Sequence, residues 1–260
     1  MNVRIPGQGA VVNVQTIIER QLRHWDNMAA VLRKQAPGKP LAEASCRPVI
    51  TLSGPIGSGI ERLAVALARE LEYDIYGREL LDAVAADLNC QRLLLEGLDE
   101  RVQSNLRTMF ETLIHGREIE NQEYLAALVR VVGSLAEKGG VIIIGRGSAF
   151  ILGHRAALRI LLEAPLEARV RRVMQSRQIS EDEARRHIAA REQAQRKFCR
   201  YYFRRELSDP TAFDLTINTE RLDPENAVAL IRAALAARGV EISRPPRGPD
   251  KTPATESAVK

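Results

Sequence analysis

One glycine-rich turn in this chain has the residue types and spacing to bind phosphate. Residues 50–59 read Ile-Thr-Leu-Ser-Gly-Pro-Ile-Gly-Ser-Gly, and residues 61–70 have the composition of a helix. The first and last glycines of the turn have the spacing of the phosphate-binding loop G-x-x-x-x-G-K-[ST]. Ile60 and Glu61 follow, so the lysine and the magnesium-binding hydroxyl of that motif are both missing.

The backbone of this loop could still bind phosphate. Glycines let successive N–H groups converge on an anion, and the N-terminus of the following helix adds partial positive charge. A carboxylate in the first helical turn is unfavourable there unless it points away or meets a metal ion, and Arg62 is the nearest cation. A glycine-rich turn without function is the alternative. The residues expected to bind nucleotide are Gly54, Pro55, Ile56, Gly57, Ser58, Gly59, Ile60 and Glu61.

The basic residues are mostly arginine, since only six of the 38 are lysine (34, 39, 138, 197, 251 and 260). Arginine suits planar, bidentate contacts with phosphate. A general preference for arginine over lysine would explain the total count equally well. The net charge of +5 also fits nucleic-acid binding. No helix-turn-helix, zinc finger or aromatic RNA-binding motif is recognisable, however, so nucleic acid is not the expected partner.

The composition is typical of a globular cytoplasmic protein. With 260 residues, 45% hydrophobic and 27% charged, the chain can bury a sizeable core. No run of about 18 apolar residues appears and Met1–Pro6 lacks the apolar centre of a secretory signal, so neither a membrane span nor export is expected. The spacing of the three cysteines and four histidines predicts neither a disulfide framework nor a metal site.

Short apolar runs alternate with long helical patterns along the chain. The run Val141–Ile144 looks buried on both faces, and strands that alternate with helices predict a parallel sheet. Ser180 and Glu183 have the spacing of a capping box, and Asp223-Pro224 reads as an N-cap followed by proline. Strands are expected at 49–52, 74–76, 141–144, 158–162 and 214–217, and helices at 167–177, 180–205 and 224–237.

This pattern predicts an α/β protein: a three-layer α/β/α domain of the P-loop type over residues 48–240, with a five-stranded parallel sheet. Two long helical insertions interrupt the alternation of strands and helices. One covers residues 77–138 between the second and third strands, and the other covers 167–205 between the fourth and fifth. Insertions of this kind usually carry substrate sites.

The flanking segments differ from the domain. Within residues 1–47, apolar positions at spacings of three and four predict an amphipathic helix over Val11–Leu32, followed by a linker. This helix is expected to pack on the domain or on a second copy of the chain, as in a homodimer. A membrane-surface helix is less favoured because the polar face carries both signs of charge. Residues 241–260 are predicted to be disordered.

Several segments, in this order along the chain, resemble the cytidylate kinase-like family of P-loop nucleoside-monophosphate kinases over about residues 48–238. The strongest match is Tyr201-Tyr-Phe203, followed by Asp209-Pro210 and by residues 213–222, Phe-Asp-Leu-Thr-Ile-Asn-Thr-Glu-Arg-Leu. The other matching segments are Gly57-Ser-Gly59, Arg78–Leu81, Leu98–Arg101, Gly139–Gly147 with its Gly-Arg turn, and Ala164–Val173.

The resemblance implies a kinase that uses ATP and Mg²⁺ and phosphorylates a nucleoside monophosphate, with CMP as a candidate. Phosphoryl transfer depends on positioning and on neutralising charge, which suits arginines. Arg146 corresponds to the family's monophosphate-binding turn, and Arg171 and Arg172 match the pair at the start of the lid. A solvated turn or helix face is the alternative for each. Catalytic roles are expected for Arg146, Arg171 and Arg172, and substrate binding for Arg78, Arg146, Arg191 and Arg196.

The sequence departs from the family's pattern where the chemistry would occur. Cytidylate kinases have aspartate after Gly-Arg, where this chain has Gly147, and often have aspartate near position 77, where Gly77 stands. Glu79 and Asp82 are carboxylates that could reach substrate or metal, although solvation is the more ordinary role.

Two functions are therefore expected. The first is an active kinase, and the second is a pseudokinase that retains a phosphorylated ligand and serves assembly or regulation. Dependence of ligand affinity on Mg²⁺ would discriminate between them, because a catalyst needs the metal whereas a backbone cradle can bind without it.

Overall fold

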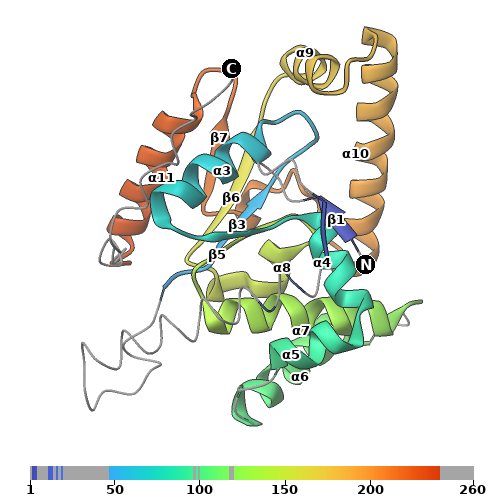
Figure 1. The fold of residues 1–260 in the computed structure, drawn as a ribbon, viewed down its shortest axis with the longest axis vertical. Helices are drawn as coiled ribbons and strands as arrows, with labels where there is room; N and C mark the ends of the chain where they lie inside the picture. Colours follow the sequence, from blue (N-terminus) through green and yellow to red (C-terminus); the bar gives the residue numbers. More distant parts are fainter. Residues whose placement is uncertain are drawn as a thin grey trace, which may run out of the picture.

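The computed structural model in Figure 1 describes residues 2–4, 11–13, 16, 19, 47–95, 98, 100–116 and 120–240. Its centre is a sheet of five strands in the order β4-β5-β3-β6-β7, and all neighbouring strands are parallel. The expected five-stranded parallel sheet is therefore confirmed. The strands are β3 (Ile50–Ser53), β4 (Asp74–Tyr76), β5 (Val141–Ile144), β6 (Leu158–Glu163) and β7 (Leu215–Asn218).

The central strand β3 is buried at all four residues, because strands flank it on both sides and helices cover both faces. In register, Leu52 lies opposite Ile144 of β5 and Ile160 of β6. Apolar residues on both faces are typical of parallel strands. Because the strands run in one direction, the loops that follow β3, β4 and β5 leave the same edge of the sheet, where open α/β sheets bind ligands.

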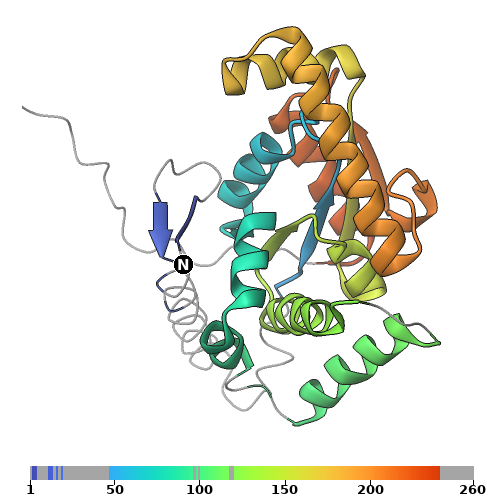
Figure 2. The same cartoon turned by 90° about the vertical axis from the view of Figure 1, so that its right-hand side faces the viewer.

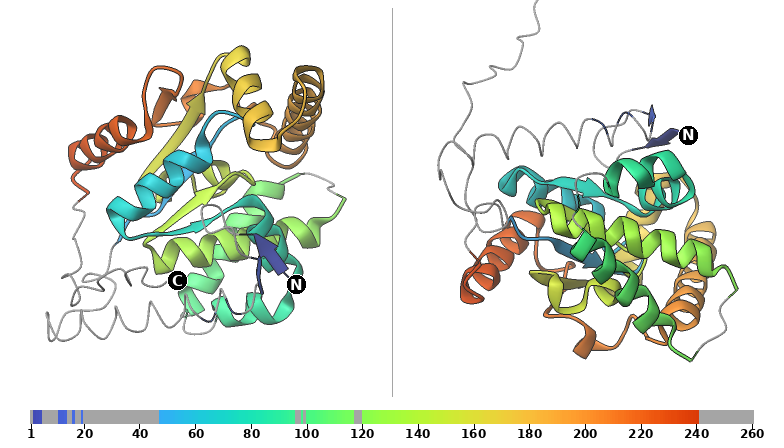
Figure 3. Two further views of the ribbon diagram at one scale, coloured as in Figure 1. Left: turned by 45° about the horizontal axis from the view of Figure 1, so that its top comes forward. Right: turned by 90° about the horizontal axis from the view of Figure 1, so that it is seen from below.

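Two helices, α3 (Ile60–Leu71) and α11 (Pro224–Ala237), cover one face of the sheet (Figure 3, left). Leu63 and Leu67 of α3 pack with Ile231 of α11 against Ile50 and the neighbouring strands in one apolar cluster. The N-terminus of α11 has the expected cap, since the Asp223 side chain accepts a hydrogen bond from the Asn226 N–H and proline follows it.

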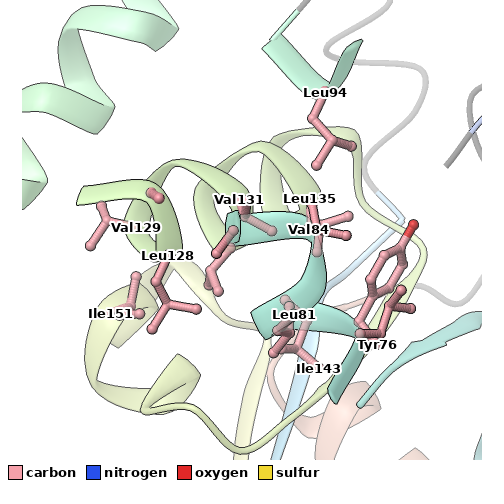
Figure 4. Close-up of a cluster of buried hydrophobic side chains, with 14 of the residues drawn as sticks. Tyr76, Leu81, Val84, Leu94, Leu128, Val129, Val131, Leu135, Ile143 and Ile151 are labelled. Atoms are coloured by element: carbon pink, nitrogen blue, oxygen red, sulfur yellow. The ribbon is translucent and has the colours of Figure 1, made fainter. Parts of the chain in front are cut away.

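The opposite face is covered by α4 (Arg78–Ala86), α7 (Gln122–Lys138) and α8 (Ser148–Leu152), and α5 (Leu88–Leu95) packs on α4 and α7. Figure 4 shows the core between them, where Leu81 of α4 lies beside Ile143 of β5 and Leu128 of α7 lies beside Ile151 of α8. The helix α6 (Glu100–Ile114) packs on the outside of α7. Helices α4 to α7 fall within residues 77–138, the first expected insertion.

The second insertion contains α9 (Leu166–Arg177) and α10 (Glu181–Phe203), which lie side by side at the edge of the domain (Figure 2). Val170 and Val173 of α9 pack against Ala184 and Ile188 of α10. The predicted capping box at Ser180 is confirmed, because its side chain accepts from the Glu183 N–H while the Glu183 carboxylate accepts from the Ser180 N–H. Caps of this kind are worth about 1 kcal/mol.

At the N-terminus, β1 (Asn2–Arg4) and β2 (Val11–Asn13) form an antiparallel pair, and β1 contacts α4. Residues 11–13 are thus a strand, which corrects the expected start of the amphipathic helix over 11–32. Apart from Thr16 and Glu19, which are helical, the rest of that predicted helix lies outside the described residues, as does the tail 241–260.

No helix in the described part of the chain is both long and apolar enough to cross a membrane.

Candidate functional site

The glycine-rich loop that is predicted to bind phosphate joins β3 to α3 at the edge of the sheet where open α/β sheets bind ligands. Gly57 and Gly59 both have a φ of +80°, a conformation that glycine adopts readily and other residues rarely do. The N–H groups of Gly57, Gly59 and Ile60 meet no acceptor among the described residues. With the N-terminus of α3, these groups are available to a phosphate anion.

The side chain of Arg172, on α9, contacts the outer side of this loop. Its Nη1 atom lies 3.1 Å from the Gly57 carbonyl oxygen and 2.9 Å from Thr219 Oγ1, and its Nη2 atom lies 2.7 Å from the Thr219 carbonyl oxygen. The Thr219 hydroxyl in turn donates to the Ser58 carbonyl oxygen at 2.6 Å. Burial and the charge of nearby Arg62 lower the pKa of Arg172. Three hydrogen bonds therefore hold this cation at the loop, and the Thr219 hydroxyl links them to Ser58.

Two further side chains, from α9 and α10, contact carbonyl oxygens of the loop. Arg169 of α9 donates to the Ile56 carbonyl oxygen at 3.5 Å and forms an ion pair with Glu192 of α10. Gln195 of α10 donates to the Gly54 carbonyl oxygen at 3.1 Å. Helices α9 and α10 thus bind carbonyl oxygens of the loop and leave the N–H groups of Gly57, Gly59 and Ile60 unpaired.

Close packing also joins α9 to the loop. A Cβ atom at Gly57 would lie 2.8 Å from the Arg169 carbonyl oxygen and 2.9 Å from its Cβ, so no side chain fits at this position. The loop and α9 are in direct backbone contact here.

The turn after β5 lies beside the loop. Its three residues, Gly145, Arg146 and Gly147, have φ values of +73°, +50° and +67°. The Gly145 N–H donates to the Leu52 carbonyl oxygen at 3.0 Å, which links this turn to the strand that precedes the loop. A positive φ costs a side-chain-bearing residue about 1–2 kcal/mol, so Arg146 sits in a strained conformation that the surrounding contacts must maintain.

The Arg146 side chain is held by residues from three helices. Its Nε atom donates to Asp82 Oδ1 at 2.6 Å, and its Nη2 atom donates to Asp82 Oδ2. Tyr124 Oη donates to the same Oδ1 at 2.8 Å, and the guanidinium carbon lies 5.0 Å from the centre of the Phe198 ring. Burial alone would lower the pKa of Arg146, but the hydrogen bonds to Asp82 raise it.

These contacts exclude the alternative given for Arg146 and correct the expectation for Asp82. Arg146 is not a solvated turn residue, because it is 24% exposed and ion-paired, and Asp82 is not merely a solvated helix carboxylate.

Two more arginines surround this position. Arg78 begins α4 and pairs with Glu79, and Arg191 lies on α10. Burial and the nearby charges of Arg78 and Arg177 lower the pKa of Arg191. Burial would raise the pKa of Glu79, but the hydrogen bond from Arg78 and the charge of Arg191 lower it. Arg78, Arg146 and Arg191 thus lie close enough to Glu79 to influence one another electrostatically. The positive charges outnumber the negative one, and this excess favours binding of an anion.

The other predicted arginines point elsewhere. The Arg171 side chain is 64% exposed and lies 3.7 Å from Glu220, and the Arg196 side chain is 53% exposed and lies 3.6 Å from Glu192. Neither side chain contacts the loop. The sequence did not single out Arg169, Gln195, Tyr124, Phe198 or Thr219, although Arg169 precedes Arg172 by three residues and so shares its helix face.

The positions that lack the motif residues have ordinary structural roles. Ile60 is 6% exposed and packs in the core beneath the loop, and Glu61 is exposed on α3. Within the described residues, no group of three or more His, Cys, Asp or Glu side chains could hold a metal ion. The loop therefore offers a phosphate the unpaired N–H groups of its backbone, and the described residues supply no set of carboxylates for a metal.

Comparison with known proteins is consistent with this geometry. The model of the cytidylate kinase-like family matches residues 49–221. The cytidylate kinase of Pyrococcus horikoshii is 31% identical over 191 residues, 72% of this chain and 88% of its own. That of Natronomonas pharaonis is 27% identical over 193 residues, 73% of this chain and 90% of its own. An uncharacterized protein from Eubacterium ventriosum shares the fold, with a TM-score of 0.53 and 18% identity over 74% of this chain and 100% of that protein.

Proposed function

Because the chain belongs to the cytidylate kinase-like family, we propose that it is an ATP-dependent nucleoside-monophosphate kinase, with CMP as the first acceptor to test. The observation that carries this proposal is the hydrogen bond between the Gly145 N–H and the Leu52 carbonyl oxygen. It holds the Gly-Arg-Gly turn beside the strand that leads into the glycine loop. A kinase needs its donor and acceptor phosphates side by side in this manner.

On the donor side, the unpaired N–H groups of the loop would bind the ATP phosphates. In most P-loop enzymes a lysine of the loop adds positive charge to this contact. Here two arginines of α9 lie at the loop, since Arg172 contacts the Gly57 carbonyl oxygen and Arg169 contacts that of Ile56. Their position on α9 would let the lid bring charge to the transferred group, as arginines do in other phosphotransferases.

On the acceptor side, Arg146 would bind the monophosphate, with Arg78 and Arg191 adding charge around it. The pair with Asp82 occupies Nε and Nη2, and Nη1 has no partner among the described residues. Three of the five N–H donors of this guanidinium are thus free for a phosphate. Charge-assisted contacts of this kind are about twice as strong as neutral hydrogen bonds.

The requirement for Mg²⁺ follows from the chemistry rather than from a visible site. Mg²⁺ is commonly bound through one or two carboxylates together with substrate phosphates and water. Glu61, exposed in the first turn of α3, is the carboxylate that directly follows the loop in sequence. It would serve as such a ligand only if its side chain turned toward the loop.

A second candidate is a pseudokinase that binds a phosphorylated ligand without turnover. The observation that favours it is Ile60, which stands at the lysine position and is buried in the core. A chain that had lost catalysis could keep the backbone cradle and the Arg146 turn for binding alone.

An ADP-release assay with ATP, Mg²⁺ and a panel of nucleoside monophosphates would test the proposal, run beside calorimetric titrations of the same ligands. Turnover with one acceptor would support the kinase and identify its substrate. Binding that is independent of Mg²⁺, without ADP release, would support the pseudokinase. Binding of no nucleotide under any of these conditions would exclude both.

A further inference from the structure

The carboxylate at the Arg146 guanidinium comes from a distant part of the chain. Asp82 lies on α4, 64 residues before Arg146, and contacts Nε and Nη2. A carboxylate from the adjacent position 147 is sterically excluded, because a Cβ atom there would lie 2.1 Å from the ring of Phe203. Asp82 therefore holds the Nε and Nη2 edge of the Arg146 guanidinium, and a carboxylate at position 147 could not.

We infer that Asp82 is a positioning residue that fixes the Arg146 guanidinium for the acceptor phosphate. This inference rests on the proposed kinase function. The alternative is that Asp82 merely neutralises Arg146 and must be displaced when phosphate binds. The two roles predict opposite effects when the carboxylate is removed, because neutralisation opposes anion binding and positioning favours it.

The hydrogen bonds of Arg146 and Asp82 are the first reason to favour the positioning role. A side-on pair through Nε and Nη2 fixes the plane of the guanidinium and leaves Nη1 free. Asp82 is itself anchored, since Tyr124 Oη donates to Oδ1 at 2.8 Å. A phenol is protonated at neutral pH and can donate this bond, and burial raises the pKa of Tyr124 further. Phosphate can thus bind Arg146 without displacing Asp82.

The second reason concerns the backbone and the aromatic ring. Arg146 has a φ of +50°, and such strain persists only where surrounding contacts over-determine the conformation. Phe198 supports the guanidinium from α10 at 5.0 Å, and Asp82 supports it from α4. A free arginine side chain loses rotamer entropy when it is ordered. Here that ordering precedes binding.

The test is Asp82→Asn, which keeps the shape and removes the charge, measured by calorimetric titration with CMP, inorganic phosphate and ATP. We expect CMP and phosphate to bind about tenfold more weakly, because Arg146 must then be ordered on binding, with ATP affinity unchanged. Asp87→Asn is the matched control. It makes the same substitution at the end of α4, where Asp87 caps α5 through the N–H groups of Asn89 and Cys90, and asparagine caps equally well.

Several outcomes would overturn the inference. Equal or tighter binding of CMP by Asp82→Asn would mean that the carboxylate only neutralises Arg146. An equal loss of ATP affinity would mean that the substitution acts on the whole domain. If the wild-type protein binds no monophosphate, the proposed function fails and takes this inference with it.

A second variant covers the case in which Asp82→Asn does not fold, as judged by its thermal melting curve. Asp82→Glu keeps the charge and moves the carboxylate by one methylene group. Positioning predicts weaker CMP binding for this variant too, with a raised acceptor KM and an unchanged ATP KM. Wild-type CMP binding by Asp82→Glu would count against positioning.

Discussion

The Nη1 atom of Arg172 lies 3.1 Å from the carbonyl oxygen of Gly57, so a cation from α9 contacts the loop that lacks the motif lysine. The neighbouring Arg171 is 64% exposed and lies 3.7 Å from Glu220 instead. The two side chains have the same chemistry and adjacent positions but different environments. They form a matched pair for experiment.

We expect Arg172→Ala to weaken ATP binding about tenfold, because a charge-assisted contact near the phosphates is lost. Arg171→Ala should change ATP affinity by less than about twofold, as exposed ion pairs contribute little. Calorimetric titration of both variants with ATP, with and without Mg²⁺, measures the difference. Equal losses in the two variants would show that the lid acts through its total charge rather than through the contact at Gly57.

Replacing Arg146 should affect the acceptor alone. We expect Arg146→Ala to weaken binding of the monophosphate by more than about 1 kcal/mol, since a partly buried charged donor is lost. ATP affinity should stay at the wild-type value. An unchanged dissociation constant for the monophosphate would rule out Arg146 as its ligand.

Gly57 should tolerate no side chain. In Gly57→Ala, the added Cβ would lie 2.8 Å from the Arg169 carbonyl oxygen at a φ of +80°. We expect the free energy of unfolding to fall by about 2–4 kcal/mol, from backbone strain together with displacement of α9 from the loop. Urea unfolding followed by circular dichroism measures this change.

Gly239→Ala separates the two contributions. Its φ of +69° imposes similar strain, but nothing lies within 4 Å of the added atom. A loss of about 1 kcal/mol is expected there from conformation alone. If Gly57→Ala cost no more than Gly239→Ala, the close approach of α9 to the loop would be of no energetic consequence.

Asp214 should stabilise the fold in a pH-dependent way. It accepts from the Arg159 backbone N–H at 2.8 Å, from Nε at 3.1 Å and from Nη2 at 2.8 Å. Burial would raise the pKa of Asp214, but these hydrogen bonds from Arg159 and the charges of Arg159 and Arg238 lower it below its ordinary 3.8. Folding thus favours the ionised carboxylate, so its stabilisation is complete above the unfolded pKa and is lost as the pH falls through the folded pKa.

We therefore expect Asp214→Asn to lose about 1–3 kcal/mol of stability at pH 7, with a smaller difference from wild type below pH 3.8. A double-mutant cycle with Arg159→Met tests whether the loss arises from this pair. A difference that stays constant down to the lowest accessible pH would contradict the pKa direction.

The sheet and its capped helices could be predicted from the sequence because their signals are local. Buried strands such as Val141–Ile144 are continuous apolar runs, and the capping box at Ser180 needs only Glu183, three residues away. The N-terminal segment is the exception. Its helical periodicity includes residues 11–13, yet these pair with β1 as a strand, so a tertiary contact overrode the local pattern.

The site was only partly predictable. The glycine loop and the Gly-Arg turn could be identified because glycine residues indicate where the backbone adopts a positive φ. The partners of Arg146 were not, since Asp82 and Tyr124 reach it across 64 and 22 residues of chain through the packing of α4 and α7. Gln195 contacts Gly54 across 141 residues in the same way.

The sequence by itself determined the succession of strands and helices within residues 48–240, the family and the glycine-rich loop on which the proposed phosphate binding rests. Only the tertiary structure decided which arginines meet the loop and the turn. Successive residues of an α-helix point about 100° apart, so Arg171 and Arg172 could not both face Gly57. The rotation of α9 about its axis, set by the packing of Val170 and Val173 on α10, turned Arg172 to the loop and Arg171 to solvent.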